Sequence, residues 1–447
     1  MRKAIVVLGV AVLAVLCAPA GGAEATAREK ELEQRVEALE KRIETLERLL
    51  EARGAPPAAT PAPAVAEKRD GTAFSGRWKD GPVWQSQDGD YTFKVGGRVQ
   101  TDWAWMTEDG DVRDVVGDLS DGVEFRRAYL TLAGLMYKRI EWKAEYDFAG
   151  GDVAWRDVYM GITDVPFVGG IRAGHFKEPF GLEELPSDNF TTFMEKSLAN
   201  TFAPSRNTGL AVGNAPLDQR MTWAAGVFRD TDNFGNRLGE GQYAVTGRLT
   251  GLPYYAEEGA HLVHVGAAAS RRSVPDEMAQ FAERPEAHLA PRFVDTGKFA
   301  ADMYNLFGTE AAFLWGPFSM QGEYMLADVD AEHGDDPRLD GGYVLASWML
   351  TGEHRNYNRR LGGFDRMRPR RNFLDGEGGL GAWELAVRWS TLDLSDELLS
   401  GGELSDVTVG LNWYLNPNSR IMWNWVHGDL DDVGDADIFQ MRLQIDF

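Results

Sequence analysis

Residues 437–447 alternate strictly between apolar and polar side chains. One parity holds Phe439, Met441, Leu443, Ile445 and Phe447, and the other holds Gln440, Arg442, Gln444 and Asp446. A period of two predicts a β-strand with one apolar and one polar face. A half-buried strand of a water-soluble sheet would alternate as well. Charge on the polar face and large hydrophobic residues on the other favour a strand between a wet lumen and lipid.

Strands of the same kind fill the chain before this one. The alternation predicts segments at 91–106, 124–135, 137–148, 153–162, 170–177, 207–214, 221–228, 243–250, 260–270, 304–315, 317–328, 342–352, 381–392, 405–415, 419–428 and 437–447. These are sixteen strands, an even number as in bacterial barrels, and enough to enclose a water channel. We predict an all-β membrane protein, with a sixteen-stranded antiparallel transmembrane β-barrel over residues 71–447.

The composition excludes several other functions. With 46 Lys and Arg against 69 Asp and Glu, the formal net charge is -23, which argues against a nucleic-acid partner. The single cysteine, Cys17, lies in an N-terminal leader, so the mature chain would have no disulfide and no thiol nucleophile. We find no spacing that pairs a nucleophile with a histidine, and we expect no enzymatic activity, cofactor or metal site.

Three segments precede the predicted barrel. Residues 1–23 have the basic start, apolar core and small residues of a signal peptide. Residues 24–53 carry heptad spacing at Leu32, Val36, Leu39, Ile43, Leu46 and Leu50. This spacing predicts a coiled-coil oligomerisation segment that leans towards a dimer, with a lone amphipathic helix as the alternative. Residues 54–70 form a Pro/Ala-rich linker.

The connections between strands should alternate between short turns and long loops. Residues 107–123, 178–206 and 271–303 are long, as expected for one end of the barrel. The 178–206 loop, after the fifth strand, either constricts the pore or caps its mouth. Residues 353–380 are long but belong to the short-turn end. Either this segment folds back against the barrel or the strands are miscounted.

Basic residues mark a candidate anion path. Parity directs Arg98, Arg127, Lys143, Arg388 and Arg442 into the lumen, and Lys177, Lys196 and Arg206 belong to the 178–206 loop or its ends. Guanidinium groups along a narrow pore bind phosphate through paired hydrogen bonds and pass it on. The alternative is that these cations pair with lumen acids such as Asp102, Glu145, Asp147, Asp157 and Glu384. A basic run at Arg366, Arg368, Arg370 and Arg371 would be a solvated loop, a lipid contact or an anion-capturing mouth.

Six short stretches carry a resemblance to a known family. They are GRVQTD at 97–102, FRRA at 125–128, GHFKEPFG at 174–181, LTGEHRNY at 350–357, GAWEL at 381–385 and GLNWYLNP at 410–417. In this order and spacing the chain resembles the phosphate-selective porin family, porins O and P, over most of residues 75–447. The resemblance implies a homotrimer of sixteen-stranded barrels in the outer membrane of a Gram-negative-type bacterium. It also implies an inward third loop, lumen arginines and a lysine-rich central site.

The expected function follows from this resemblance and from the lumen cations. We expect an outer-membrane porin for passive diffusion of anions, such as inorganic phosphate or polyphosphate, through a narrow arginine-lined pore. The barrel region has few lysines and the chain is acidic, so porin activity carries over better than phosphate specificity. The alternative is a general diffusion porin that also tethers the envelope through its N-terminal coiled coil.

Overall fold

The computed structural model describes residues 37–38, 41–42, 45, 73–332, 336–397 and 399–447. The chain divides into two units, Met1–Asp70 and Gly71–Phe447. In the first unit the described residues are helical and exposed, and Lys41 Nζ lies 2.9 Å from a Glu37 carboxylate oxygen. The predicted signal peptide, the linker up to residue 70 and most of the coiled coil lie outside the described residues and stay predictions.

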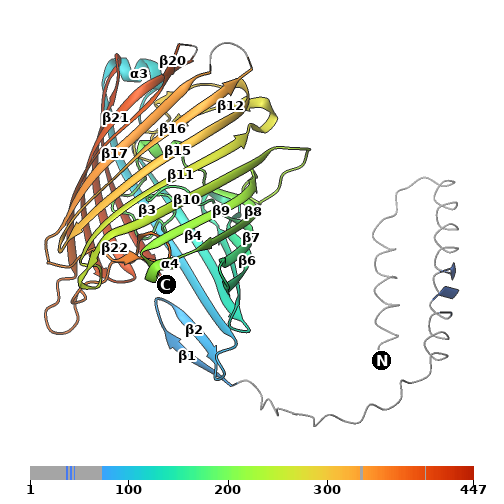
Figure 1. Cartoon of the computed structure of the whole chain (residues 1–447). Helices are drawn as coiled ribbons and strands as arrows, with labels where there is room; N and C mark the ends of the chain where they lie inside the picture. The colour runs from blue at the N-terminus through green and yellow to red at the C-terminus, as the bar shows by residue number, and fades with distance from the viewer. Residues whose placement is uncertain (1–36, 39–40, 43–44, 46–72, 333–335, 398) are drawn as a thin grey trace, which may run out of the picture. The chain divides into compact units, whose positions relative to one another are not determined.

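The second unit is a closed antiparallel barrel (Figure 1). Its strands are β3 (Thr92–Glu108), β4 (Gly122–Met136), β5 (Ile140–Asp147), β6 (Ala154–Val165), β7 (Gly169–Lys177), β8 (Arg206–Asn214), β9 (Met221–Arg229), β10 (Tyr243–Ala256), β11 (His261–Ser273), β15 (Phe299–Trp315), β16 (Phe318–Ala331), β17 (Arg338–Met349), β20 (Ala382–Asp396), β21 (Leu399–Asn416), β22 (Ser419–Leu430) and β23 (Gly434–Asp446). Each pairs with the next, and β23 pairs with β3 from Ala436↔Glu108 to Asp446↔Arg98. Each predicted strand overlaps one of these sixteen, so the predicted barrel is confirmed.

Alternation along each strand separates the two faces of the wall. On β20, for example, Trp389 is 52% exposed on the outside while the neighbouring Arg388 is 1% exposed inside. Aromatic rings pair across the outer surface, with centroids 5.8 Å apart for Trp105 and Phe439 and 4.9 Å for Trp383 and Trp413. An outer surface of large apolar and aromatic side chains suits contact with lipid.

A hairpin outside the sixteen strands was missed from the sequence. β1 (Phe74–Trp78) and β2 (Pro82–Ser86) pair with each other, and β2 pairs with the start of β3, for example Trp84↔Phe93. Both strands are short, and Gly81 and Pro82 are residue types typical of turns. The alternation of apolar and polar side chains therefore did not reveal this hairpin.

Helices and minor strands lie in the connections. They are α3 (Gly110–Val116), α4 (Pro216–Gln219), η1 (Ala149–Gly151), η2 (Leu198–Phe202), η3 (Glu257–Gly259), η4 (Pro275–Glu277), β12 (Met278–Ala279), β13 (Ala282–Glu283), β14 (Val294–Asp295), β18 (Tyr357–Asn358) and β19 (Gly363–Phe364). In the part of the chain that the structure describes, no helix is long and apolar enough to span a membrane.

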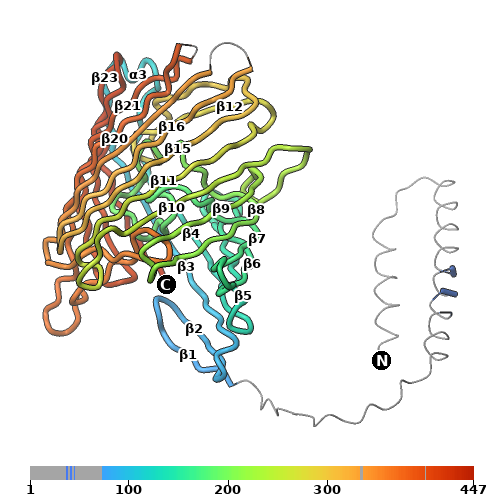
Figure 2. Tube along the Cα trace, viewed as in Figure 1, coloured from blue at the N-terminus to red at the C-terminus, as the bar shows by residue number. Residues whose placement is uncertain are grey.

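Residues 350–381, at the end of the barrel with the short turns, fold back into the lumen. Figure 2 shows the tilted strands and the C-terminus at this same end. Arg355 donates a hydrogen bond to Gln321 Oε1 of β16 at 2.8 Å, and Arg366 pairs with Asp446 of β23. Of the two explanations for this long connection, the inward fold is therefore the right one, and the strand count stands.

Two more loops fill the lumen from the opposite end. Residues 178–205 and 274–298 meet where the rings of Phe202 and Phe281 lie 5.5 Å apart. These side chains belong to a buried apolar cluster that also includes Leu198, Val294 and residues of β15–β22. Because apolar side chains pack densely here, this side of the bore is closed and the wall of β3–β9 borders the remaining space.

Closure of the barrel at its last residue gives a testable prediction. Phe447 N–H donates to Gly97 O at 3.0 Å, and Gly97 N–H donates to Phe447 O at 2.9 Å. A Cβ at Gly97 would lie 2.7 Å from Phe447 Cζ. We expect Gly97→Val to displace Phe447, to destabilise the closed barrel by about 1–3 kcal/mol, and to lower the folded fraction on heat-modifiability gels.

The matched control is Gly251→Ala on β10, where an added Cβ has no atom within 4 Å. This variant should fold like the wild type. A normal folded fraction for Gly97→Val would show that closure does not depend on the contact with Phe447.

Candidate functional site

The 178–205 loop lies inside the lumen, fixed by polar side chains of the wall. Glu323 of β16 accepts hydrogen bonds from the backbone N–H groups of Leu182 and Glu183. On the other side, Asn424 Oδ1 accepts from Met194 N at 2.9 Å, and Asn412 Nδ2 donates to Thr192 O at 2.7 Å. The loop is thus tied across the bore, which fits a constriction rather than a cap over the mouth.

Arg388 and Arg442 also hold the inward loops. Arg442 donates to both carboxylate oxygens of Asp102, at 2.7 and 2.6 Å, and to Glu195 of the loop at 2.7 Å. Arg388 binds Glu183 at 3.0 Å and Glu286 of the 274–298 loop. Their side chains are 0% and 1% exposed. Both guanidinium groups therefore anchor loops, and their predicted part in an anion path stays a prediction.

Lys143 and Arg206 form a compact cluster with two carboxylates on the open wall. Lys143 Nζ lies 2.7 Å from Asp157 and 3.1 Å from Glu145. Arg206 lies 2.7 Å from Asp157 and 3.9 Å from Glu145. The four charges balance, while the Lys143 side chain is still 23% exposed to the lumen.

The other four predicted cations gather around Asp188 of the loop. Arg98 and Arg127 each approach its carboxylate to 3.4 Å, Lys196 to 3.6 Å and Lys177 to 3.8 Å. Burial opposes ionisation of Asp188, but the charges of Lys177, Arg127 and Lys196 hold its pKa well below its ordinary value. The fold thus brings these predicted residues together around an ionised carboxylate.

All eight predicted cations have carboxylate partners. This is the arrangement expected if the cations serve to pair with lumen acids rather than to form an anion path. In the ion-pair network of the wall from β3 to β8 and the adjacent loop, nine cations nevertheless share seven carboxylates, while Asp102, Glu178 and Glu183 of the same region pair with arginines of other strands. The nine cations are Arg98, Arg126, Arg127, Lys143, Arg156, Arg172, Lys177, Lys196 and Arg206, and the seven acids that they contact are Glu141, Glu145, Asp147, Asp157, Glu184, Asp188 and Glu195. Within this network several carboxylates are therefore shared between two or more cations.

Sequence reasoning missed Arg126, whose parity is opposite to that of Arg127. The pairing of β3 with β4 shifts between Gln100 and Thr101, so that Arg126 is an extra residue in the ladder. Arg126 consequently faces the lumen as well and donates two hydrogen bonds to Glu195, at 2.9 and 2.8 Å. A β-bulge changes the face of the following side chains, and strict alternation cannot anticipate it.

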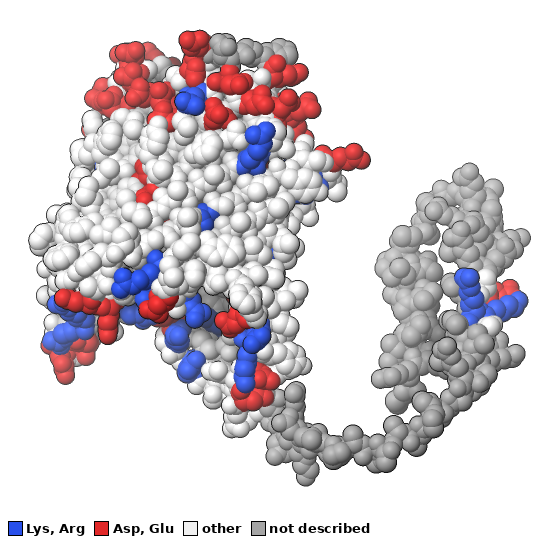
Figure 3. All heavy atoms as spheres, viewed as in Figure 1, with Lys and Arg blue, Asp and Glu red and all other residues white. Residues whose placement is uncertain are grey.

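A cavity of about 450 Å³ lies in the lumen beside β6–β9. Its lining includes the basic residues Arg172, Lys177, Arg248 and Arg360 and the acids Glu141 and Asp164. Arg360 forms no ion pair with any residue that the structure describes. In Figure 3, Lys and Arg side chains are frequent near the short-turn end, while Asp and Glu crowd the opposite end. The cavity therefore offers an anion more positive than negative neighbours.

The basic run near the short-turn end is largely neutralised by acids. Arg366 pairs with Asp446, Arg368 lies 2.6 Å from Asp80, and Arg371 lies 2.9 Å from Asp375. Arg366 also donates to the backbone carbonyl of Pro417. These contacts fix the inward segment to the barrel rim, so the basic run has a structural role.

A closed sixteen-stranded barrel with a polar, charged bore narrowed by an inward loop is the architecture of a porin. The family model described as phosphate-selective porin O and P matches residues 93–447, and the chain belongs to that family. As expected from the short stretches, it is an outer-membrane protein.

Two relatives and one solved structure set the degree of similarity. Porin O of Pseudomonas aeruginosa is 25% identical over 427 residues, covering 85% of this chain and 93% of that protein. An uncharacterised protein of Caulobacter vibrioides is 28% identical over 397 residues, covering 86% and 75%. A loop-deletion mutant of OmpT, an outer membrane protein of Vibrio cholerae, superimposes with a TM-score of 0.51 at 12% identity, covering 80% of this chain and all of that one. This last likeness concerns the fold alone.

The anchoring contacts of Arg442 give the second prediction. Arg442→Met keeps a side chain of similar length but leaves Asp102 without its buried partner and removes one of the partners of Glu195, a change that costs about 3–5 kcal/mol. We expect the 178–205 loop to loosen from the wall. Single-channel conductance in planar bilayers should rise and become noisier.

Arg371→Met is the matched control, because that guanidinium pairs with Asp375 in an exposed turn. It should leave conductance unchanged. If Arg442→Met folds normally and conducts like the wild type, the arginine does not set the width of the pore.

Proposed function

We propose that this porin carries small anions by passive diffusion along the β3–β8 side of its lumen. The observation that carries the proposal is the network on that side in which nine cations share seven carboxylates. A narrow bore with low-dielectric walls focuses the field of such a row of cations and raises the local concentration of anions beside it. Diffusion down a gradient requires no catalytic group.

The pairing of the cations shapes how an anion would pass. A guanidinium has five N–H donors, and a carboxylate partner uses only some of them. A passing anion therefore binds the remaining donors briefly and moves to the next cluster, from the groups around Asp188 to Lys143 and Arg206 and on to Arg172. Because each cation keeps a carboxylate partner, in several cases a shared one, binding is weak and release is fast, as conduction requires.

Phosphate or polyphosphate is the proposed physiological cargo. Family membership and the similarity to Porin O of Pseudomonas aeruginosa support this choice. The scarcity of lysines predicts weak rather than tight phosphate binding. We propose a homotrimer in the outer membrane as the assembly, on the same family grounds.

Opposite charge changes within one cluster test the anion path. Lys143→Gln removes a positive charge beside Asp157, and Asp157→Asn removes the negative charge at the same place. A unit charge a few ångströms from the path changes the energy of an ion by about 1 kcal/mol in a wet lumen. The anion-to-cation permeability ratio, measured from reversal potentials in a salt gradient, should fall roughly two- to fivefold in the first variant and rise in the second.

The two variants serve as controls for each other, since both break the same 2.7 Å pair. A shift in the same direction in both would indicate a change of structure rather than of charge. No shift in either would remove this cluster from the ion path.

Phosphate itself is tested by competition. We expect millimolar phosphate, added to a chloride solution, to reduce the chloride current, because both anions occupy the same cationic clusters. Sulfate at the same ionic strength is the control for general screening. A current that phosphate leaves unchanged would reject phosphate as the cargo while leaving an anion-conducting porin.

A further inference from the structure

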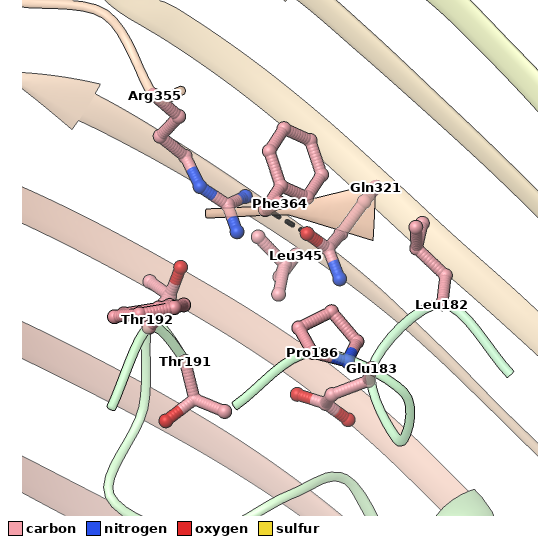
Figure 4. Close-up of a pocket in the computed structure, with 10 residues that line it drawn as sticks. Leu182, Glu183, Pro186, Thr191, Thr192, Gln321, Leu345, Arg355 and Phe364 are labelled. Atoms are coloured by element: carbon pink, nitrogen blue, oxygen red, sulfur yellow. Dashed lines mark hydrogen bonds between the residues drawn. The ribbon is translucent and has the colours of Figure 1, made fainter. Parts of the chain in front are cut away.

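A second, much smaller cavity lies where two inward segments meet. It has a volume of about 20 Å³ and is lined by residues of the 178–205 loop, the 350–381 segment, β16 and β17 (Figure 4). About 10–15 Å³ on this measure is needed for one water molecule. On this measure the cavity suits one monoatomic ion better than the larger phosphate.

Arg355 brings a buried positive charge to this cavity. The residue is 7% exposed and forms no ion pair with the described residues. Its guanidinium carbon lies 3.7 Å from the ring centroid of Phe364, and one nitrogen donates to Gln321 Oε1 at 2.8 Å. Burial lowers the pKa of Arg355 from its ordinary value. A buried charge with a neutral partner is costly unless a counter-charge lies within reach.

Thr192 offers a further donor from the loop side of the cavity. Its hydroxyl oxygen is buried and has no hydrogen-bond partner in the described structure. Figure 4 shows the side chain of Thr192 and the guanidinium of Arg355 turned into the same space. The amide of Gln321 adds a donor, since one of its two N–H groups is free beside the bond to Tyr343. Three kinds of donor thus converge from three segments.

One carboxylate, that of Glu183, also lines the cavity. Its two oxygens are already engaged, one by Arg388 Nη1 at 3.0 Å and the other by Ser197 N at 2.9 Å. Glu183 is therefore neutralised from the opposite side. Glu384, the other acid whose charge reaches Arg355, lies outside the cavity lining and accepts hydrogen bonds from Asn412 and Tyr414 instead.

We propose that this cavity binds a single halide ion, chloride under physiological conditions, between Arg355 and Thr192. The ion supplies the counter-charge of Arg355 and the acceptor for the Thr192 hydroxyl. It joins the loop that enters from one end of the barrel to the segment that enters from the other. The site is separate from the transport path: it is a structural anion site that fixes the two elements narrowing the bore.

Bromide locates such a site because it substitutes for chloride and scatters anomalously. We would crystallise the full barrel in sodium bromide and compare wild type, Arg355→Gln and Arg420→Gln. Arg420 is the matched control: it is buried and has no acid partner among the residues that the structure describes, but it donates to Gln444 Oε1 at 3.1 Å and to Thr191 O at 2.7 Å. The peak should lie between Arg355 and Thr192 in the wild type and in Arg420→Gln, and should vanish in Arg355→Gln.

Thermal unfolding of the same proteins gives an independent measurement. At equal ionic strength, sodium chloride should raise the wild-type Tm by a few degrees above sodium gluconate, since a ligand of the folded state stabilises it. Phosphate should give no such rise. Thr192→Val retains the charge of Arg355 and should reduce the rise in Tm that chloride causes. This variant tests the site even if Arg355→Gln does not fold. An equal chloride effect in Thr192→Val and the wild type, or wild-type crystals without the bromide peak, would overturn the proposal.

Discussion

The structure depends on closure of the backbone ladder within the bilayer. In hydrocarbon a strand edge has no water to satisfy its N–H and C=O groups, so each must pair within the protein. The ladder from β23 to β3 removes the last two edges, and the mutual bonds of Gly97 and Phe447 complete it. The closed wall has lipid outside and water inside. Apolar and polar side chains therefore alternate along every strand. The charged lumen follows from this geometry.

A bore of sixteen strands is too wide to be filled by wall side chains, and the inward segments take up that space. They are held by ionic and polar contacts rather than by a continuous apolar core. Arg442 ties the 178–205 loop to β3 and β23, and Arg388 ties it to the 274–298 loop. Such charges cannot be removed singly without leaving a buried partner unpaired. The residues that narrow the pore are therefore also the ones that hold its shape.

Alternation was sufficient to predict all sixteen strands, because each crosses the same two environments. It also placed Arg98, Arg127 and Lys143 on the inner face. It could not predict their partners, since Asp188 lies 90 residues from Arg98 in sequence and Asp102 lies 340 from Arg442. Those pairings arise only when the barrel closes and the loops enter. The inward-facing Arg126 was missed for a local reason, the bulge opposite Gln100 and Thr101.

Charge pairing reconciles an acidic chain with the proposed anion path. Much of the excess of Asp and Glu lies on exposed loops, such as Asp109, Asp111 and Asp114 near the long-loop end. Screening over about 8–10 Å in salt limits the reach of these charges into the bore. Inside, where screening is weaker, the arrangement of the ion pairs along β3–β8 shapes the local potential. On the proposed path, selectivity depends on the cations that share carboxylates in this network rather than on the net charge of the chain, so single substitutions in the lumen should tune it.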